Sequence, residues 1–257
     1  MSMAAEARRD AISRVLLPAM VAVLVLGFWQ GASRLSGVPE VLLPPPSSII
    51  ARLISAAPEI AYHSLVSGWD ALLAFLLAAV AGIAIALVMS ASTWLREALY
   101  PNLILFQVIP KIALAPLFVI WLGIGSTSRI TFAVFVSLFP VAIACFEGFA
   151  RADRNILTLC RGICATPTQT FFAVRIPFAL PYLFSGLKIA ATMAVIGIVV
   201  GEFVTARAGV GFFILQASSK ADTAGIFAAL FGLCIVGFAL YGAVAAAEAA
   251  ARRWWRG

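Results

Sequence analysis

Charged residues are scarce in this chain of 257 residues, of which 11% are charged and 63% are hydrophobic. Water-soluble domains carry about a quarter charged residues. The mean hydropathy of +1.06 therefore argues against an ordinary soluble domain and predicts a polytopic membrane protein. The length permits one or two domains, and one bundle of membrane helices is the simpler interpretation.

The residues of common catalytic and metal sites are also nearly missing. His63 is the single histidine, and HExxH zinc motifs and G-x-x-x-x-G-K-[ST] phosphate loops do not occur. The cysteines Cys145, Cys160, Cys164 and Cys234 lack zinc-binding spacing. We therefore expect no metal, no bound cofactor and no ATP hydrolysis by this chain. His63, placed just before an apolar run, is interpreted as an interfacial residue.

Acidic residues are outnumbered by basic ones, 11 to 18, which gives a net charge of +7. An excess of this kind can indicate nucleic-acid binding, but no soluble stretch interleaves basic and aromatic residues. Lys and Arg also collect in the cytoplasmic loops of membrane proteins. The positive charge is therefore assigned to membrane topology rather than to a nucleic-acid partner.

Six apolar runs are long enough to cross a bilayer, which takes about 20 residues. They cover roughly residues 15–33, 65–89, 101–122, 130–149, 179–203 and 224–247. The first follows several arginines, but its length favours a retained span over a cleaved signal peptide. The third run contains Pro110 and Pro116, so we expect it to be interrupted.

The basic residues predict that both termini face the cytoplasm. With the N-terminus inside, eleven fall on the cytoplasmic side, five fall outside, and Lys111 and Lys188 lie in or near spans, which accounts for all 18. This asymmetry fits an even number of spans. The predicted divisions are a first span with an external connector (1–60), a five-span core (61–247) containing a cytoplasmic loop (150–178), and a cytoplasmic tail (248–257).

Several polar residues near the spans admit simple interpretations. Glu147 and Glu202 are expected to be interfacial, whereas Asp70 either pairs with another helix or is reached by water. Lys111 either faces protein or water, or extends toward the cytoplasmic surface. In the external connector, Ser47 or Ser48 is expected to cap a short helix over residues 49–56.

The most polar interruption of the apolar sequence is RADRNILTLCRGICATPTQTFFAVRIPFALP, residues 151–181. Pro167 divides it, because proline lacks an amide donor and disfavours helix in the preceding residue. We expect a helix-sized first half, residues 153–166, and a second half that ends at Pro177 and Pro181. Such a basic loop between spans is expected to contact a partner.

These motifs resemble a known family. The loop is similar to the cytoplasmic Glu-Ala-Ala loop of binding-protein-dependent ABC importer permeases, and VRIPFALPYLFSGLKIA (174–190) matches its second half. LPPPSSII (43–50) and VIPKIALAPLFVIWLGIG (108–125) resemble segments of the nitrate, sulfonate and taurine branch. The resemblance implies an all-α membrane protein with the type I importer permease fold, N-in and C-in, in a bacterial cytoplasmic membrane.

The loop departs from the family pattern in its first half. Thr158, Leu159 and Cys160 stand where the family writes Glu-Ala-Ala, and Cys164 stands where it writes glycine. Leu159 and Cys164 are bulkier than the alanine and glycine of the family, so an altered ATPase partner or an altered affinity for it stays open. The apolar residues Ile156, Leu159 and Ile163 nevertheless keep the spacing of one helix face.

The resemblance also implies partners and roles. They are two ATPase subunits that carry ATP and magnesium, a second permease copy, and a substrate-binding protein outside the membrane. Contact with the ATPase is assigned to Arg154, Ile156, Thr158, Leu159, Cys160, Arg161, Gly162, Ile163, Cys164, Val174, Ile176 and Pro177. The translocation path is assigned to Gln107, Lys111, Thr192 and Met193.

The expected function is ATP-driven import of a small polar or anionic solute such as a sulfonate, taurine or nitrate. The same branch also imports pyrimidine and other vitamin precursors, and this alternative stays open. A membrane enzyme is disfavoured because no catalytic constellation is present. A weakly coupled channel or scaffold remains the other alternative, because the Glu-Ala-Ala half of the loop is altered.

Overall fold

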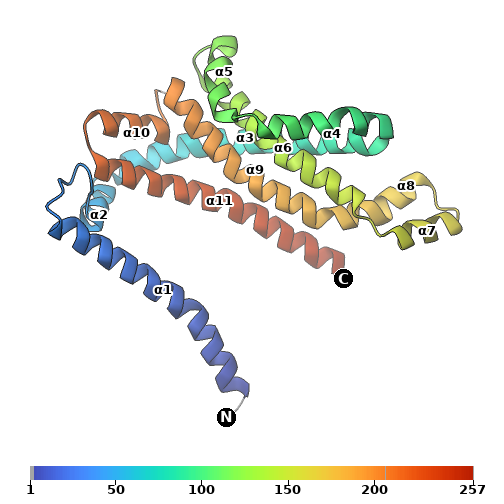
Figure 1. Ribbon diagram of the computed structural model, residues 1–257, viewed down its shortest axis with the longest axis horizontal. Coiled ribbons are helices and arrows are strands. Elements are labelled where there is room, and N and C mark those ends of the chain that lie inside the picture. The colour runs from blue at the N-terminus through green and yellow to red at the C-terminus, as the bar shows by residue number, and fades with distance from the viewer. Residues whose placement is uncertain (1–2, 206, 257) are drawn as a thin grey trace. The chain divides into compact units, whose positions relative to one another are not determined.

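The computed structural model describes residues 3–205 and 207–256, with side chains from residue 16 to 253 apart from Arg154 and residue 206. The described chain is almost entirely helical (Figure 1). It divides into two compact units, Met1–Ile60 with Ile214–Leu230, and Ala61–Phe213 with Phe231–Gly257. Each unit is described by itself.

The first unit joins the N-terminal helix to a short connector helix. It contains α1 (Met3–Leu35), α2 (Pro46–Ser55) and the adjoining parts of α10 (Val210–Ser219) and α11 (Thr223–Arg256). Ser33 donates to the carbonyl of Leu43 over 2.7 Å, and Arg52 pairs with Asp222 over 2.7 Å. The first bond ties the proline-rich segment to α1, and the second ties α2 to the turn before α11.

The start of α2 differs from the sequence prediction. The helix begins three residues earlier than expected, at Pro46, and its N-cap residue Pro45 makes no side-chain capping bond. Neither Ser47 nor Ser48 is the cap. Proline at the first helical position needs no amide partner and already has a helical φ, so it replaces a serine cap here.

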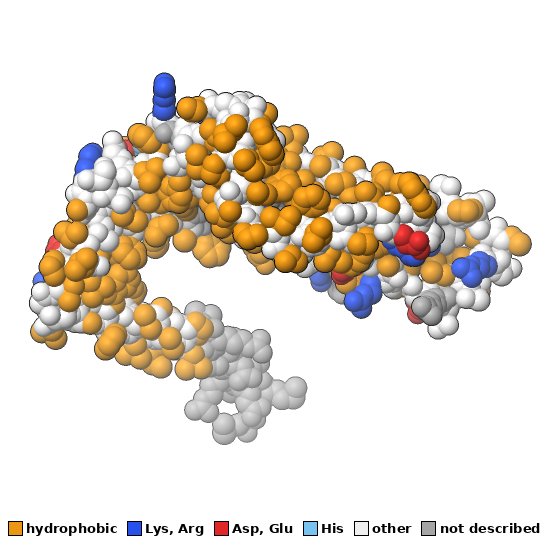
Figure 2. All heavy atoms as spheres, turned by 45° about the horizontal axis from the view of Figure 1, so that its top comes forward, with side chains coloured by type: hydrophobic (Ala, Val, Ile, Leu, Met, Phe, Trp, Pro, Cys, Tyr) orange, Lys and Arg blue, Asp and Glu red, His pale blue; other side chains and the backbone are white. Residues whose placement is uncertain are grey.

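The second unit holds the remaining helices. They are α3 (Ala57–Ala91), α4 (Thr93–Val108), the 3-10 turn η1 (Lys111–Leu114), α5 (Ala115–Leu122), α6 (Ser126–Ala150), α7 (Arg154–Gly162), α8 (Pro167–Thr170), the π-turn η2 (Phe171–Arg175) and α9 (Ile176–Thr205), with most of α11. Figure 2 shows hydrophobic side chains over much of the visible surface and most charged ones near helix ends. This distribution suits helices surrounded by lipid.

The described residues contain five helices long and apolar enough to cross a membrane, or six with the bent pair of α4 and η1–α5. The pair bends by 90° at the break before Lys111. This agrees with the six predicted spans and with the interruption predicted at Pro110. Pro116 falls in the first turn of α5, where a missing amide donor breaks no helical bond.

The centre of the second unit is the close packing of α6 against α9. A methyl group added at Gly186 would lie 2.7 Å from the Ala144 methyl, and one at Gly197 would lie 2.7 Å from Cα of Ala133. Small residues let helices approach closely in lipid, where dispersion and shape decide association. Since these two helices lead into and out of the 151–175 loop, the loop rests on the most tightly packed part of the unit.

Candidate functional site

The loop between α6 and α9 forms a short helical excursion, α7 followed by α8 (Figure 1). Asp153 caps α7, since its carboxylate accepts from the amide of Asn155 over 2.8 Å. A carboxylate at a helix N-terminus satisfies a free amide and complements the helix dipole. The sequence places α7 correctly, although the helix ends at Gly162 rather than near Thr166.

The end of α7 is a Schellman motif built around Cys164. The amide of Ala165 donates to the carbonyl of Cys160 over 2.9 Å, and that of Cys164 donates to Arg161 over 3.1 Å. Cys164 occupies the left-handed region with φ 55°. This backbone conformation favours glycine, because the Cβ of any other residue crowds the backbone there. The family glycine and the cysteine of this chain therefore occupy a conformationally demanding point.

The predicted elbow at Pro167 is confirmed, but the predicted end at Pro177 and Pro181 is wrong. Thr166 and Gln169 form a reciprocal capping box that starts α8. The chain then continues through η2 into α9 as one span, Pro167–Thr205. The amide of Ile176 donates five residues back, to Phe171. This wider turn gives the ring of Pro177 room without ending the helix.

The residues assigned to ATPase contact fall into an exposed group and a packed group. Thr158, Leu159, Arg161, Gly162, Ile163 and Cys164 are exposed, with Leu159 and Ile163 at 64% and 68%. Ile156, Cys160, Ile176 and Pro177 are half-buried, and Val174 is buried. The backbone of Arg154 begins α7, but its side chain lies outside the described part. The loop therefore presents apolar side chains on its outer surface.

Of the residues assigned to the translocation path, Gln107 and Lys111 flank the break between α4 and α5, and Thr192 and Met193 lie on α9. Gln107 is exposed near the end of α4, and Lys111 is half-buried with its ammonium 5.0 Å from the ring centre of Phe139. Met193 packs against the cluster formed by Phe118 and Phe132. Thr192 is exposed, and its hydroxyl bonds its own helix. Met193 thus contacts the broken span, and the assignment of these four residues to the path stays a prediction.

Phenylalanine rings line the same region. Phe106 lies 5.8 Å from Phe139, which contacts Phe135 at 5.2 Å between ring centres. Phe135 in turn lies 5.5 Å from Phe118. The ammonium of Lys111 is therefore placed at an aromatic surface, where the ring faces attract cations.

At the other end of α9, the structure corrects two predicted interfacial residues. Glu202 is 1% exposed and accepts from the hydroxyl of Ser67 over 2.6 Å and from the amide of Gly211 over 2.7 Å. His63 is buried, and its Nδ1 accepts from the amide of Gly209 over 3.0 Å. Both side chains satisfy backbone donors of the turn before α10, and so they hold that turn against α3.

Beside them lies a buried ion pair that resolves the alternatives for Asp70. Its carboxylate accepts from Arg129 over 2.7 Å, and both side chains are about 10% exposed. Asp70 therefore pairs across helices. An unpaired charge within a membrane span costs free energy. The pairing of Asp70 with Arg129 avoids this cost and stabilises the contact between α3 and α6.

A second polar contact joins α9 to α11. Lys188 donates to Glu248 over 2.5 Å, and Glu248 also accepts from Arg252 over 2.5 Å. The ammonium of Lys188 lies 5.6 Å from the ring centre of Tyr241. Lys188 lies in α9, the helix that follows the loop, and this bond ties that helix to α11.

Comparison with known proteins assigns this arrangement to a family. Residues 78–254 match the family described as "Binding-protein-dependent transport system inner membrane component". The matched segment includes the broken span, the α7–α8 loop and most of α11. The chain belongs to this family, and it is a membrane permease subunit of an ABC importer rather than an enzyme.

Curated relatives agree along nearly the whole chain. A "Probable ABC transporter permease protein" of Haemophilus influenzae is 34% identical over 89% of this chain and 93% of its own length. A "Formylaminopyrimidine transport permease protein ThiX" of Halalkalibacterium halodurans is 32% identical over 90% and 92%. Other relatives, at 27–30% identity, are named as sulfonate, taurine, bicarbonate and nitrate permeases.

Among solved structures, the chain resembles one of the "MetNI methionine ABC transporter". The similarity has a TM-score of 0.57 at 20% identity and covers 78% of this chain and 96% of the other. The predicted type I importer permease fold is thereby confirmed. The protein is a permease for small solutes that works with ATPase subunits.

Proposed function

We propose that the α7–α8 loop is the surface through which the ATPase subunits drive this permease. The single observation that carries the proposal is the exposure of Leu159 and Ile163 on the loop that connects α6 to α9. Apolar side chains on an otherwise polar excursion are typical of a partner contact. Closure of two ATPases on ATP would move α7, and the rigid α6–α9 pair would transmit that movement.

The proposed mechanism is alternating access. In a dimer of this chain, the path lies near the break of α4 and α5, and ATP binding biases the bundle between inward and outward openings. The charge bias supports a cytoplasmic position for α7 and for both termini, in a bacterial cytoplasmic membrane. A binding protein delivers the solute on the opposite side.

The first candidate substrate is a small polar anion such as a sulfonate, taurine or nitrate, because Lys111 is a half-buried cation at the broken span. The second candidate is a pyrimidine-like heterocycle. It is favoured by the phenylalanines around Lys111, which offer ring faces for stacking, and by the pyrimidine permease among the relatives. Uptake of labelled taurine and of a labelled aminopyrimidine into the same vesicles distinguishes the two.

Substitution of Ile163 by aspartate tests the docking surface. A charge at the centre of an apolar contact is expected to release the ATPase, because the carboxylate loses water without gaining a partner. Tagged Ile163→Asp should insert normally but should lose the ATPase during purification in mild detergent. Ala250→Asp, at an exposed position of α11 beyond the predicted span 224–247, is the matched control. Full retention of the ATPase by Ile163→Asp contradicts the proposal.

A further inference from the structure

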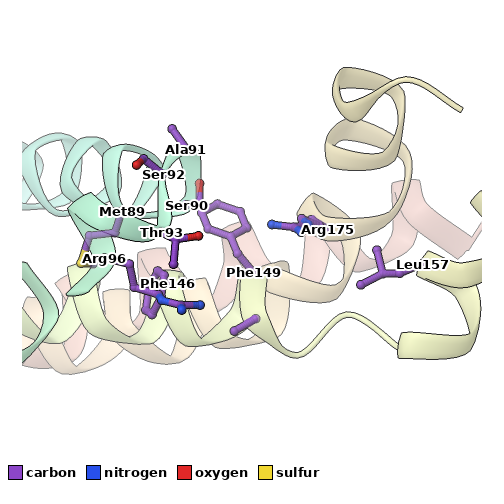
Figure 3. A pocket seen from close by; sticks show the side chains of 11 residues that line it. Met89, Ser90, Ala91, Ser92, Thr93, Arg96, Phe146, Phe149, Leu157 and Arg175 are labelled. Carbon is purple, nitrogen blue, oxygen red and sulfur yellow. The ribbon is translucent and has the colours of Figure 1, made fainter. Parts of the chain in front are cut away.

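The second unit contains a cavity of about 330 Å³ beside the α7–α8 loop (Figure 3). The turn between α3 and α4 contributes the hydroxyls of Ser90, Ser92 and Thr93. Arg96, one turn into α4, and Arg175, at the end of η2, contribute two guanidinium groups. The two arginines come from segments far apart in the sequence, and the fold places both on one cavity.

The floor of the cavity is apolar and rigid. Phe146 and Phe149 of α6 are 9% and 6% exposed, and Met89 is 1% exposed. A low-dielectric floor strengthens the attraction between the guanidinium groups and an anion above it. Thr93 and Arg96 are exposed, so the cavity can be reached from outside.

The charge of the cavity is one-sided. No acidic residue lines it, and among the described residues Arg175 forms no ion pair. Arg96 has only a long contact with Glu97, 3.9 Å, between two exposed side chains. The neighbouring pocket, which shares Arg96, differs because Glu97 and Glu147 also line it. Of these two cavities, the first therefore combines two cations and hydroxyl groups without a counter-charge, and the second does not.

We propose that this cavity binds a phosphate group, either free or on the head of an anionic lipid. Guanidinium groups form paired hydrogen bonds with phosphate oxygens, and the hydroxyls of Ser92 and Thr93 supply further donors, whereas the Ser90 hydroxyl donates to the carbonyl of Leu87. Ligand sites commonly occupy 300–1,000 Å³, so about 330 Å³ accommodates a phosphate with a small head group. A bound phosphate would link the α3–α4 turn to η2. The proposal does not depend on ATPase docking or on the substrate.

The proposal is tested with the full-length protein in a non-ionic detergent, which carries no anionic group of its own. The probes are dihexanoyl phosphatidylglycerol, inorganic phosphate and dihexanoyl phosphatidylcholine, each titrated by calorimetry at one ionic strength. Arg175→Gln and Arg96→Gln are each expected to weaken binding about tenfold, since one charge-assisted contact is lost. Arg175→Lys should keep part of the affinity. Arg253→Gln, which removes the same charge from an exposed site outside the cavity, should bind normally.

The outcomes separate the sources of phosphate. Saturable binding of both phosphatidylglycerol and inorganic phosphate, weakened by Arg175→Gln, supports a general phosphate site. Binding of phosphatidylglycerol alone supports a lipid site. The proposal is overturned if the Arg175, Arg96 and Arg253 variants bind phosphatidylglycerol and inorganic phosphate with equal affinity. It is also overturned if neither of these two compounds shows saturable binding. Release of the ATPase by Arg175→Gln without any phosphate binding also overturns it, because the cavity then serves a protein carboxylate.

If Arg175→Gln does not fold, Ser92→Ala and Thr93→Val replace it. Both remove a hydroxyl donor from the cavity and leave the packing of α6 and α9 unchanged. Together they are expected to weaken phosphate binding several-fold, and unchanged affinity would contradict the assignment.

Discussion

Replacement of Cys164 by glycine is expected to stabilise the α7–α8 loop. Cys164 has φ 55°, and an L-residue in this left-handed region carries a penalty of about 1–2 kcal/mol that glycine avoids. Glycine also has more conformational entropy in the opened loop, and this reduces the stabilisation by about 0.4–1 kcal/mol. A net gain of about 0.8 kcal/mol follows, equivalent to about a fourfold change in the opening equilibrium.

Hydrogen exchange measures this change directly. The amides of Cys164 and Ala165 donate to Arg161 and Cys160, so their protection reports opening of the motif. After correction for intrinsic exchange, Cys164→Gly should slow the exchange of these amides about fourfold relative to the wild type. Cys164→Ala removes the sulfur but keeps a Cβ, so it should exchange as the wild type does. Equal exchange in the glycine and alanine variants would refute the reasoning from backbone strain.

Two further predictions concern the packing of the second unit, and denaturation in detergent measures both. Gly197→Ala should cost about 1–3 kcal/mol of unfolding free energy, because its methyl meets the backbone of Ala133, whereas Gly237→Ala, which meets nothing within 4 Å, should be neutral or stabilising. Equal stability of the two variants would contradict close packing of α6 on α9. Asp70→Asn should cost about 3–5 kcal/mol by leaving Arg129 buried without its partner, and the added substitution Arg129→Gln should recover part of the loss. Additive losses in the double variant would show that the two side chains do not interact.

Local chemistry predicted the breaks in the chain. Pro110 and Pro167 interrupt helices because each proline removes an amide and restricts the residue before it, and both effects are visible in the sequence. The same reasoning fails at Pro177. There the π-turn η2 absorbs the defect, and the sequence alone does not reveal a widened turn supported by tertiary packing.

The buried polar contacts were harder to predict because their partners are distant in sequence. Ser67 and Glu202 are 135 residues apart, and His63 and Gly209 are 146 apart. A single histidine or glutamate near a span end is usually interfacial, and only the fold shows that these two satisfy backbone amides. One signal was available: Gly209 and Gly211 flank a turn close to Glu202, and glycine permits close approach of backbone to a carboxylate.

The α7–α8 loop shows both how far the sequence predicts local structure and where that prediction ends. The family pattern has glycine at the position of Cys164, and sequence analysis treated the difference as one of side-chain bulk, whereas the left-handed φ of Cys164 adds a conformational reason for glycine there. Exposure of Leu159 and Ile163 follows from their spacing only in part, because Ile156 on the same predicted face is half-buried.

Uptake into vesicles tests the central claim most directly. The purified permease is reconstituted with its ATPase and binding protein, and accumulation of labelled solute is followed with ATP on the side of the α7–α8 loop. We predict uptake that requires both ATP and the ATPase subunits. Equal uptake in vesicles that contain this chain alone would contradict ATP-driven import and would favour a channel.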